Sequence, residues 1–328
     1  MLRPTICLLL AISSASASAQ SLSADDKRVV IEQSARLLEQ RYVYPDKGKT
    51  LAAKLRKSSR LWKDQSDPQA FARVVTDWLR ANGSDGHLGI SYSATPIAEA
   101  DGGRNFDRAE MDRWYGPHIN HGVERIERLP GNVMLLDLRV FPPAEIAGDV
   151  IAAAMSVVAQ GDALIIDLRH NGGGGSTNNL MTGYLLDTPE APLSGAYNRP
   201  EDKNIASVSP AWVPGRRFGG TKPLYILTSR RTFSAAEAFA YDLQALKRAV
   251  IVGETTGGGA HPFEYRRIHA HFALNLPESR SVNPITGTNW QDVGVKPDVP
   301  VDAAHALEEA LKLARQSIAE RDSVDPGS

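Results

Sequence analysis

The spacing of hydrophobic positions changes character near residue 85. Before that point, apolar side chains recur at helical spacing, for example over Val29–Leu38. Two helix starts are marked: Ser23 precedes Asp26 as in a capping box, and Asp67-Pro68 puts proline in a first turn. This pattern predicts a small N-terminal helical bundle over residues 20–84.

Beyond residue 85, short apolar runs alternate with helical segments. The stretch 94–121 is polar and glycine-rich, which predicts a loop with one short helix. The apolar runs predict strands at 88–92, 123–128, 133–140, 163–168, 224–228, 249–252 and 265–276. Helical spacing predicts helices at 144–159, 177–186, 235–246 and 303–319. This order predicts an α/β domain over residues 85–328, with a largely buried sheet that places ligands at the carboxyl ends of its strands.

The first residues have the composition of a secretory signal peptide. Arg3 precedes an apolar run over Ile6–Ile12, and Ala17-Ser18-Ala19 forms an Ala-x-Ala cleavage site. The apolar run is far shorter than the roughly 20 residues of a membrane-spanning helix. We therefore expect a signal peptide over residues 1–19 and a protein exported to the periplasm or secreted. Since the one cysteine, Cys7, lies in this segment, the mature chain would have no thiol nucleophile and no disulfide.

Charge and histidine content exclude several classes of partner. The formal net charge is -1, so no strong field favours nucleic acid or a membrane surface, and we expect no nucleic-acid partner and no stable membrane association. The closest histidine pair, His269-x-His271, lacks a recognisable third ligand, and we read it as structural. The sequence therefore predicts no metal and no cofactor.

A glycine-rich loop follows the strand predicted at 163–168. It begins with Asp167-Leu168-Arg169-His170-Asn171 and continues through Gly172–Gly175. Glycines let a backbone approach a ligand closely and direct N–H groups at it, as in a phosphate cradle or an oxyanion hole. A phosphate site is disfavoured because the Lys-Ser/Thr of a P-loop is missing. A flexible turn remains the other interpretation.

A serine and a histidine complete the candidate chemistry. Ser234 lies where a strand ends and a helix of small residues begins, so the N–H groups of the helix terminus favour negative charge there. The alternative is an ordinary N-cap, with Glu237 completing a capping box. His87, in Ser84-Asp85-Gly86-His87, can take a serine proton as general base, although a lone histidine is more often an ordinary polar residue.

Taken in order, these segments resemble the tail-specific (C-terminal processing) serine peptidase superfamily. The resemblance rests on Asp167-Leu168-Arg169-x-Asn171-Gly172-Gly173, on Thr232-Phe233-Ser234-Ala235-Ala236-Glu237, and on Gly294-Val295-x-Pro297-Asp298. It implies a crotonase/ClpP-like ββα spiral domain and Ser234 as nucleophile. It also implies an oxyanion hole built from backbone N–H groups of Gly172, Gly173 and Ala235.

Departures from the pattern indicate a branch of the superfamily. Gly259 stands where the processing peptidases carry the lysine of a Ser-Lys dyad, and only 35 residues separate His87 from Val123, too few for a PDZ domain. The chain is more similar to the branch of the tricorn core protease and interphotoreceptor retinoid-binding protein. In tricorn-like enzymes a histidine is the base, which corresponds to His87.

The supporting acidic residue of that branch is not matched. Gln291 stands at its position, so Asp85, Gln291 and Asp292 are the candidates to support His87. The sequence thus predicts an exported serine peptidase acting on a peptide or protein substrate. The alternative is a weakly active or inactive homologue that binds a hydrophobic small molecule or a peptide terminus. The sequence does not define an oligomeric state.

Overall fold

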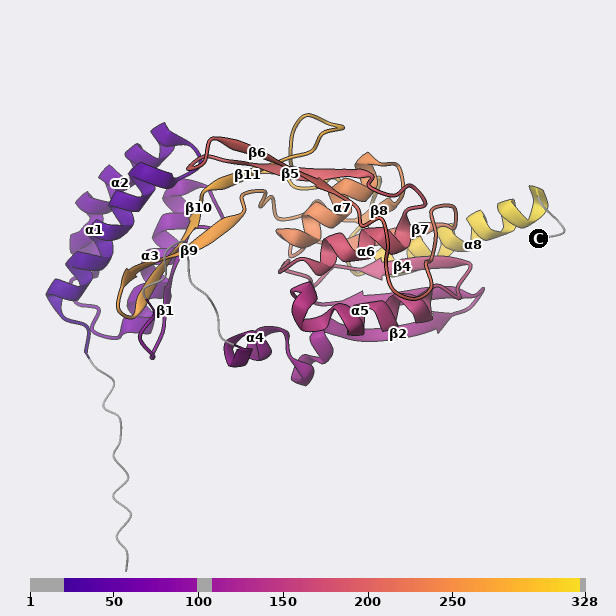
Figure 1. Ribbon diagram of the computed structural model, residues 1–328, viewed down its shortest axis with the longest axis horizontal. Helices are drawn as coiled ribbons and strands as arrows, with labels where there is room; N and C mark the ends of the chain where they lie inside the picture. The colour runs from indigo at the N-terminus through magenta and orange to yellow at the C-terminus, as the bar shows by residue number, and fades with distance from the viewer. Residues whose placement is uncertain (1–20, 99–107, 325–328) are drawn as a thin grey trace, which may run out of the picture.

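The N-terminal helices form a bundle at one end of the molecule (Figure 1). The computed structural model describes residues 21–98 and 108–324. The bundle consists of α1 (Ala24–Arg41), α2 (Pro45–Ser58), the 3-10 helix η1 (Ser59–Trp62) and α3 (Pro68–Gly83). The predicted capping box at the start of α1 is present: the Ser23 hydroxyl accepts from the Asp26 N–H at 3.1 Å, and the Asp26 carboxylate accepts from the Ser23 N–H at 3.1 Å.

Two strands distant in sequence complete the core of this bundle. They are β9 (Phe263–His269) and β10 (Phe272–Pro277), which join β1 (Gly89–Tyr92) in an antiparallel sheet of order β1-β10-β9. The side chains of these strands that pack among the helices are Ile90, Ile268, Phe272, Leu274 and Leu276. We call the helices α1–α3 with this sheet the N-terminal lobe. The expected strand over 265–276 is therefore a hairpin that turns at Ala270-His271, and a domain boundary at residues 84/85 stays a prediction.

The second part of the chain contains a six-stranded, mostly parallel sheet. Its order is β12-β8-β7-β4-β3-β2, and β2 is antiparallel to β3. The strands are β2 (Val123–Leu129), β3 (Val133–Leu138), β4 (Ala163–Asp167), β7 (Leu224–Thr228), β8 (Val250–Gly253) and β12 (Val299–Pro300). The central strands β3, β4 and β7 are buried along their whole length, which explains why they read as continuous apolar runs.

Helices cover both faces of this sheet. Alternate residues Leu164 and Ile166 of β4 pack with α5 (Ala144–Val158), α6 (Thr177–Leu185) and α7 (Ala235–Ala245). Their neighbours Ala163 and Ile165 pack under α8 (Ala306–Val324). We call this sheet with its helices the α/β body. The predicted fold class, a crotonase/ClpP-like α/β domain preceded by a small helical bundle, is confirmed.

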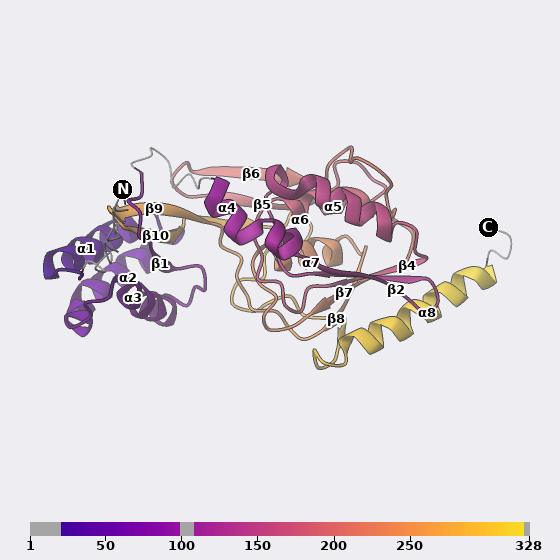
Figure 2. The ribbon, with the colours of Figure 1, turned by 90° about the horizontal axis from the view of Figure 1, so that it is seen from below.

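A long hairpin connects the N-terminal lobe and the α/β body, as both views show (Figures 1 and 2). It comprises β5 (Pro192–Asn198) and β6 (Lys203–Val208), which join β11 (Ser279–Val282) in the order β11-β5-β6. The Ser194 N–H and hydroxyl donate to the buried Asp242 carboxylate on α7 at 3.0 and 2.6 Å. In the turn between β5 and β6, the Arg199 guanidinium donates to the Tyr42 carbonyl at 2.5 Å. The hairpin is thus held at both ends.

Between β1 and β2 the described chain forms α4 (Arg108–Tyr115) and the 3-10 helix η2 (Pro117–Gly122), where a loop with one short helix was expected. Among the described residues, no helix combines the length and the apolar character that crossing a membrane requires. The expected signal peptide lies outside the described residues.

Candidate active site

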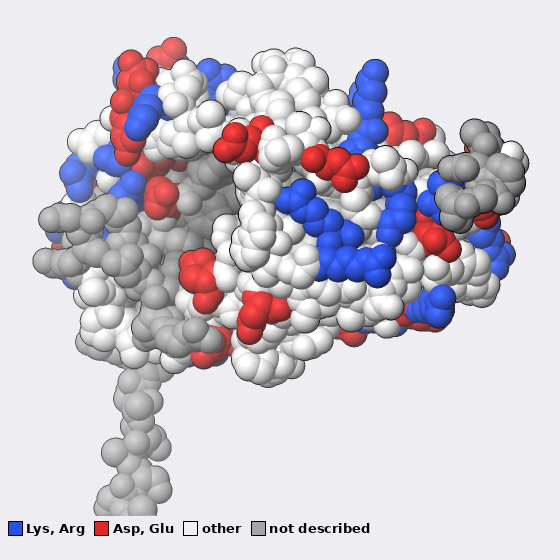
Figure 3. All heavy atoms as spheres, turned by 45° about the vertical axis from the view of Figure 1, so that its right-hand side comes forward, with Lys and Arg blue, Asp and Glu red and all other residues white. Residues whose placement is uncertain are grey.

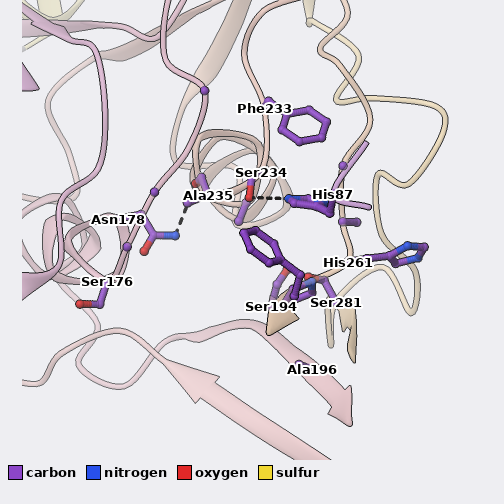
Figure 4. Close-up of a pocket in the computed structure, with 18 of the residues that line it drawn as sticks. His87, Ser176, Asn178, Ser194, Ala196, Phe233, Ser234, Ala235, His261 and Ser281 are labelled. Carbon is purple, nitrogen blue, oxygen red and sulfur yellow. Dashed lines mark hydrogen bonds between the residues drawn. The ribbon is translucent and has the colours of Figure 1, made fainter. Parts of the chain in front are cut away.

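Ser234 and His87 meet across the junction of the two parts of the molecule (Figure 4). The Ser234 Oγ and the His87 Nε2 are 2.9 Å apart. Ser234 sits in the turn between β7 and α7 with φ 55° and ψ -119°, a conformation that L residues rarely adopt. This sharp turn presents the hydroxyl to the histidine instead of folding it into the helix. The structure therefore brings together the two residues singled out from separate sequence segments.

The His87 ring lies between two aromatic rings. Its centroid is 4.8 Å from that of Phe233 and 5.5 Å from that of Phe263. The residue is 6% exposed, and burial lowers the pKa of His87 to about 4, against the opposing charge of Asp85. The imidazole is therefore neutral near pH 7 and can accept a proton from the serine hydroxyl at Nε2.

Asp85 is the carboxylate next to His87. Its Oδ1 accepts the His87 backbone N–H at 3.0 Å and lies 3.9 Å from the His87 Nδ1. Its Oδ2 accepts from the Tyr42 hydroxyl at 3.0 Å and from the His261 Nδ1 at 2.7 Å. Of the three candidates to support His87, Asp85 is the one that the fold places beside it.

Gln291 and Asp292 are placed elsewhere. The Gln291 Oε1 accepts the backbone N–H of Ala260 at 2.8 Å, and its amide donates to the Asp292 carboxylate at 2.8 Å. Asp292 is exposed and occupies a left-handed turn with φ 65°. Neither side chain hydrogen-bonds to His87 within the described parts of the chain. The structure therefore does not place these two of the three candidates beside His87, and Gln291 binds the loop at Ala260 instead.

The glycine loop packs directly against the serine. Gly173 has φ 104°, and a Cβ there would lie 2.7 Å from the Ser234 Cβ, so only glycine permits this approach. The Gly173 N–H donates to the Asn171 side chain at 2.8 Å. It is therefore already occupied, in contrast to its expected part in an oxyanion hole. The N–H groups of Gly172 and Ala235 have no acceptor among the described residues.

Glu237 connects the serine turn to the loop after β8. Its buried carboxylate accepts the Ser234 N–H at 2.8 Å, the Gly258 N–H at 2.6 Å and the Gly259 N–H at 2.8 Å. The Thr256 hydroxyl donates to the same carboxylate at 2.5 Å. Burial raises the pKa of Glu237, and these hydrogen bonds oppose the rise. The residue expected to do no more than cap the helix thus also fixes the position of the serine.

Gly259, where the processing peptidases carry their lysine, has no room for a side chain. A Cβ there would overlap the Phe233 ring and lie 2.9 Å from the His87 Cε1. The space beside Ser234 is therefore filled by the imidazole and the aromatic ring that packs on it.

Ser234 lines a cavity of about 830 Å³ that lies between the N-terminal lobe and the α/β body. Among the described residues that line it, Arg80 is the only permanently charged side chain. Aromatic and aliphatic side chains form much of the rest: Met111, Trp114, Tyr115, Ile205, Phe233, Phe263, Tyr265 and Trp290. Acidic and basic side chains are mixed over the face seen in Figure 3, in line with the near-zero net charge. A cavity of this size, lined by apolar groups with a few polar ones, has the character of a ligand-binding site.

His269 and His271, which the sequence analysis interprets as structural, each contact another group of the protein. The His269 Nε2 lies 3.2 Å from the Asp26 carboxylate, and the His271 Nδ1 lies 2.9 Å from the Ser93 carbonyl. The described residues contain no group of three His, Cys, Asp or Glu side chains that could hold a metal ion.

Two residues of the site were not found from the sequence. His261 follows the glycine-rich segment after β8, and Tyr42 lies just past α1, where the sequence indicated only a helix end. A polar residue two positions beyond the Gly257–Gly259 run was the one available signal for His261. Nothing in the pattern pointed to Tyr42, because its contact with Asp85 depends on how α1 packs.

A peptidase family and a curated protease match parts of this chain. The family described as Peptidase family S41 matches residues 133–301. The tail-specific protease of Haemophilus influenzae is 32% identical over 139 residues, which are 41% of this chain and 16% of that protein. The chain therefore matches only a small part of the length of this relative.

Solved structures share the fold at low identity. A lipoprotein from Streptococcus agalactiae has a TM-score of 0.59 at 18% identity, over 87% of this chain and 96% of that one. The photosystem II D1 C-terminal processing protease has a TM-score of 0.53 at 16% identity, over 88% and 97%. The tricorn protease has a TM-score of 0.58 at 13% identity, over 90% of this chain and 37% of that one.

Proposed function

Since the chain belongs to peptidase family S41, we propose that it hydrolyses peptide bonds with Ser234 as nucleophile and His87 as general base. The observation that carries this proposal is the 2.9 Å contact between the Ser234 Oγ and the His87 Nε2 in a cavity of about 830 Å³. A neutral imidazole within hydrogen-bond distance of a serine hydroxyl is the arrangement that activates this nucleophile.

The reaction proceeds in two halves. The Ser234 Oγ attacks the substrate carbonyl carbon while its proton moves to the His87 Nε2, and the carbonyl oxygen becomes an oxyanion. The imidazolium then donates that proton to the leaving amine as the C–N bond breaks, which leaves an acyl-enzyme. Water, deprotonated by His87, attacks the ester and releases the acid, and Ser234 recovers its proton.

Backbone donors near the serine stabilise the oxyanion. The N–H groups of Gly172 and Ala235 have no acceptor within the described chain, and both residues line the same cavity as Ser234. The Gly173 N–H is held by Asn171, so its contribution is the close approach of the loop. We assign the oxyanion hole to Gly172 and Ala235 on these grounds.

Asp85 stabilises the charge that develops on His87. The negative carboxylate raises the pKa of His87 and so opposes the effect of burial. A small movement of the His87 ring that shortened the 3.9 Å separation between the Asp85 Oδ1 and the His87 Nδ1 would complete a Ser234–His87–Asp85 triad. In this protein the carboxylate comes from the turn before β1, two residues from the histidine.

The substrate is a peptide or an unfolded protein segment, because the cavity is open enough for a chain and is lined largely by apolar groups. Turnover of a peptide library tests this. We expect cleavage by the parent protein and none by Ser234→Ala or His87→Gln of unchanged fold. Saturable binding of a hydrophobic ligand or a peptide by a parent protein that cleaves nothing would favour the alternative function instead.

Export completes the proposed role. The composition of residues 1–19 supports cleavage after Ala19 and action outside the cytoplasm. Sequencing the N-terminus of the protein recovered from the periplasm or medium tests this, with Gln20 expected as the first residue. An intact Met1 start in a cytoplasmic fraction would contradict it.

A further inference from the structure

We infer that His261 is a positioning residue for catalysis: it holds the Asp85 carboxylate toward His87, assisted by Tyr42. This inference rests on the proposed function. Neither residue touches the reacting atoms, and both act through Asp85.

The Asp85 carboxylate is buried and surrounded by hydrogen-bond donors. The carboxylate is 2% exposed, and its Oδ2 accepts from both the His261 Nδ1 and the Tyr42 hydroxyl. Its Oδ1 is then left facing His87, where it accepts the backbone N–H. A carboxylate with one oxygen fixed by two donors cannot rotate freely, so Oδ1 stays at the His87 backbone N–H, 3.9 Å from the His87 Nδ1, which has no other partner among the described residues.

The contact also determines which nitrogen of His261 carries a proton. An ionised carboxylate only accepts hydrogen bonds, so the proton must be on the Nδ1 that lies 2.7 Å away. The Nε2 of His261 is buried and has no partner among the described residues. A second proton there would be a buried donor without an acceptor, which favours the neutral ring with Nδ1–H.

A neutral His261 leaves His87 a stronger base than a positively charged His261 would. A positive charge on His261 lowers the pKa of His87 and would weaken the base. A neutral donor instead leaves Asp85 with its full negative charge, available to the imidazolium that forms on His87. The site therefore requires a hydrogen-bond donor at position 261 and not a cation.

The competing explanation is that His261 is packing. Its ring stacks edge-on against Tyr44 at a centroid distance of 5.4 Å, and the residue is buried. Asn and Leu have similar size and shape, but only Asn offers an N–H close to the position of Nδ1. A packing role would tolerate Leu at least as well as Asn, whereas a donor role requires Asn.

The test compares His261→Asn with His261→Leu by the rate at which a fluorophosphonate acylates Ser234 and by the kcat and KM of peptide turnover. We expect Leu to slow acylation and lower kcat about 10- to 100-fold with little change in KM, as outer-sphere partners of catalytic groups do. We expect Asn to restore most of that loss. Tyr42→Phe removes one hydroxyl, should lower kcat by a smaller factor, and serves as the test if His261→Leu does not fold.

Two results separate this inference from the proposed function. A parent protein that is not labelled at Ser234 overturns the proposed function, and this inference with it. If the parent is labelled at Ser234, the positioning role is overturned when the acylation rate and kcat of His261→Leu equal or exceed those of His261→Asn. If His261→Leu does not fold, Tyr42→Phe at the parent rate overturns it. Either result leaves the proposed peptidase function intact.

Discussion

Gly259 lies against His87 so closely that a Cβ at position 259 would come within 2.9 Å of the His87 Cε1. The processing peptidases that the chain resembles carry a lysine at this position. Here a histidine from the N-terminal lobe reaches Ser234 instead, and the Phe233 ring packs against both His87 and Gly259. A side chain at position 259 and the observed positions of His87 and Phe233 therefore exclude one another.

Gly259→Ala should reduce activity strongly. Its Cβ would overlap the Phe233 ring and press on His87, so the imidazole must shift away from Ser234. We expect peptide turnover to fall by about 100-fold or more, the size of a lost general base, and stability to fall by about 1–3 kcal/mol from overpacking. Turnover rates and urea unfolding measure the two effects. Gly148→Ala is the glycine control for the overpacking effect, because φ is not positive there and a Cβ would meet its neighbours only at 3.8 and 4.0 Å.

Replacing the nucleophile by glycine should stabilise the protein. Ser234 has φ 55° and ψ -119°, where a Cβ is strained by about 1–3 kcal/mol, while glycine loses about 0.5–1 kcal/mol through unfolded-state entropy. Ser234→Gly is therefore expected to melt higher than Ser234→Ala, although both are inactive. Equal melting temperatures would mean that the strain is no larger than the entropy loss, and a lower melting temperature for Ser234→Gly would show that the turn is unstrained.

The acid limb of activity should have a midpoint near pH 4. The pKa of His87 is lowered to about 4 by burial, so the base loses its free Nε2 only below that pH. The profile of kcat/KM against pH, over the range where the protein stays folded, measures this directly. A midpoint near the ordinary histidine value of about 6.5 would mean that the ring is hydrated in solution.

The lowered pKa of His87 also means that this residue reduces the stability of the folded protein in acid. Between pH 6.5 and about 4 the unfolded chain binds a proton on this residue and the folded chain does not, so stability falls as the pH drops through that window. The contribution is up to about 3 kcal/mol. Urea unfolding of His87→Gln at pH 7 and pH 4 should show a smaller loss than in the parent. An unchanged loss would contradict the shift.

Asp242 should change the stability of the protein with pH in the opposite direction. Burial raises its pKa to about 6, so its contribution to stability is present below the ordinary value of 3.8 and is lost as the pH rises through 6. Its Oδ1 accepts all of its hydrogen bonds from Ser194 and Asn283, and an asparagine retains that oxygen. Relative to the parent, Asp242→Asn should gain up to about 3 kcal/mol between pH 4 and pH 7. If the difference in free energy of unfolding between Asp242→Asn and the parent stayed constant from pH 4 to pH 7, the pKa of Asp242 would not be raised.

Much of the fold could be predicted because its signals are local. The strands β3, β4 and β7 are apolar throughout, and the cap residues Ser23 and Asp67 lie next to the helices that they begin. The hairpin of β5 and β6 was not predicted. β6 is almost wholly exposed, and glycine and serine interrupt β5, so neither strand shows an alternating pattern.

The site was predictable to the extent that its residues lie in motifs. Ser234, His87 and the Gly172–Gly173 loop each follow a turn that sequence can identify, and the structure places the serine, the histidine and the loop in contact with or lining one cavity. The contacts of Asp85 with His261 and Tyr42 join residues 176 and 43 positions apart. Such contacts depend on how the two parts of the chain pack, which no local pattern encodes.

Labelling of the protein by a fluorophosphonate probe, with the modified residue located by mass spectrometry, tests the central claim most directly. The account predicts phosphonylation at Ser234 in the parent, none in Ser234→Ala, and a rate in His87→Gln lower by about 100-fold or more. Labelling of another serine, or equal labelling of parent and His87→Gln, would contradict the assignment of Ser234 and His87 as nucleophile and base.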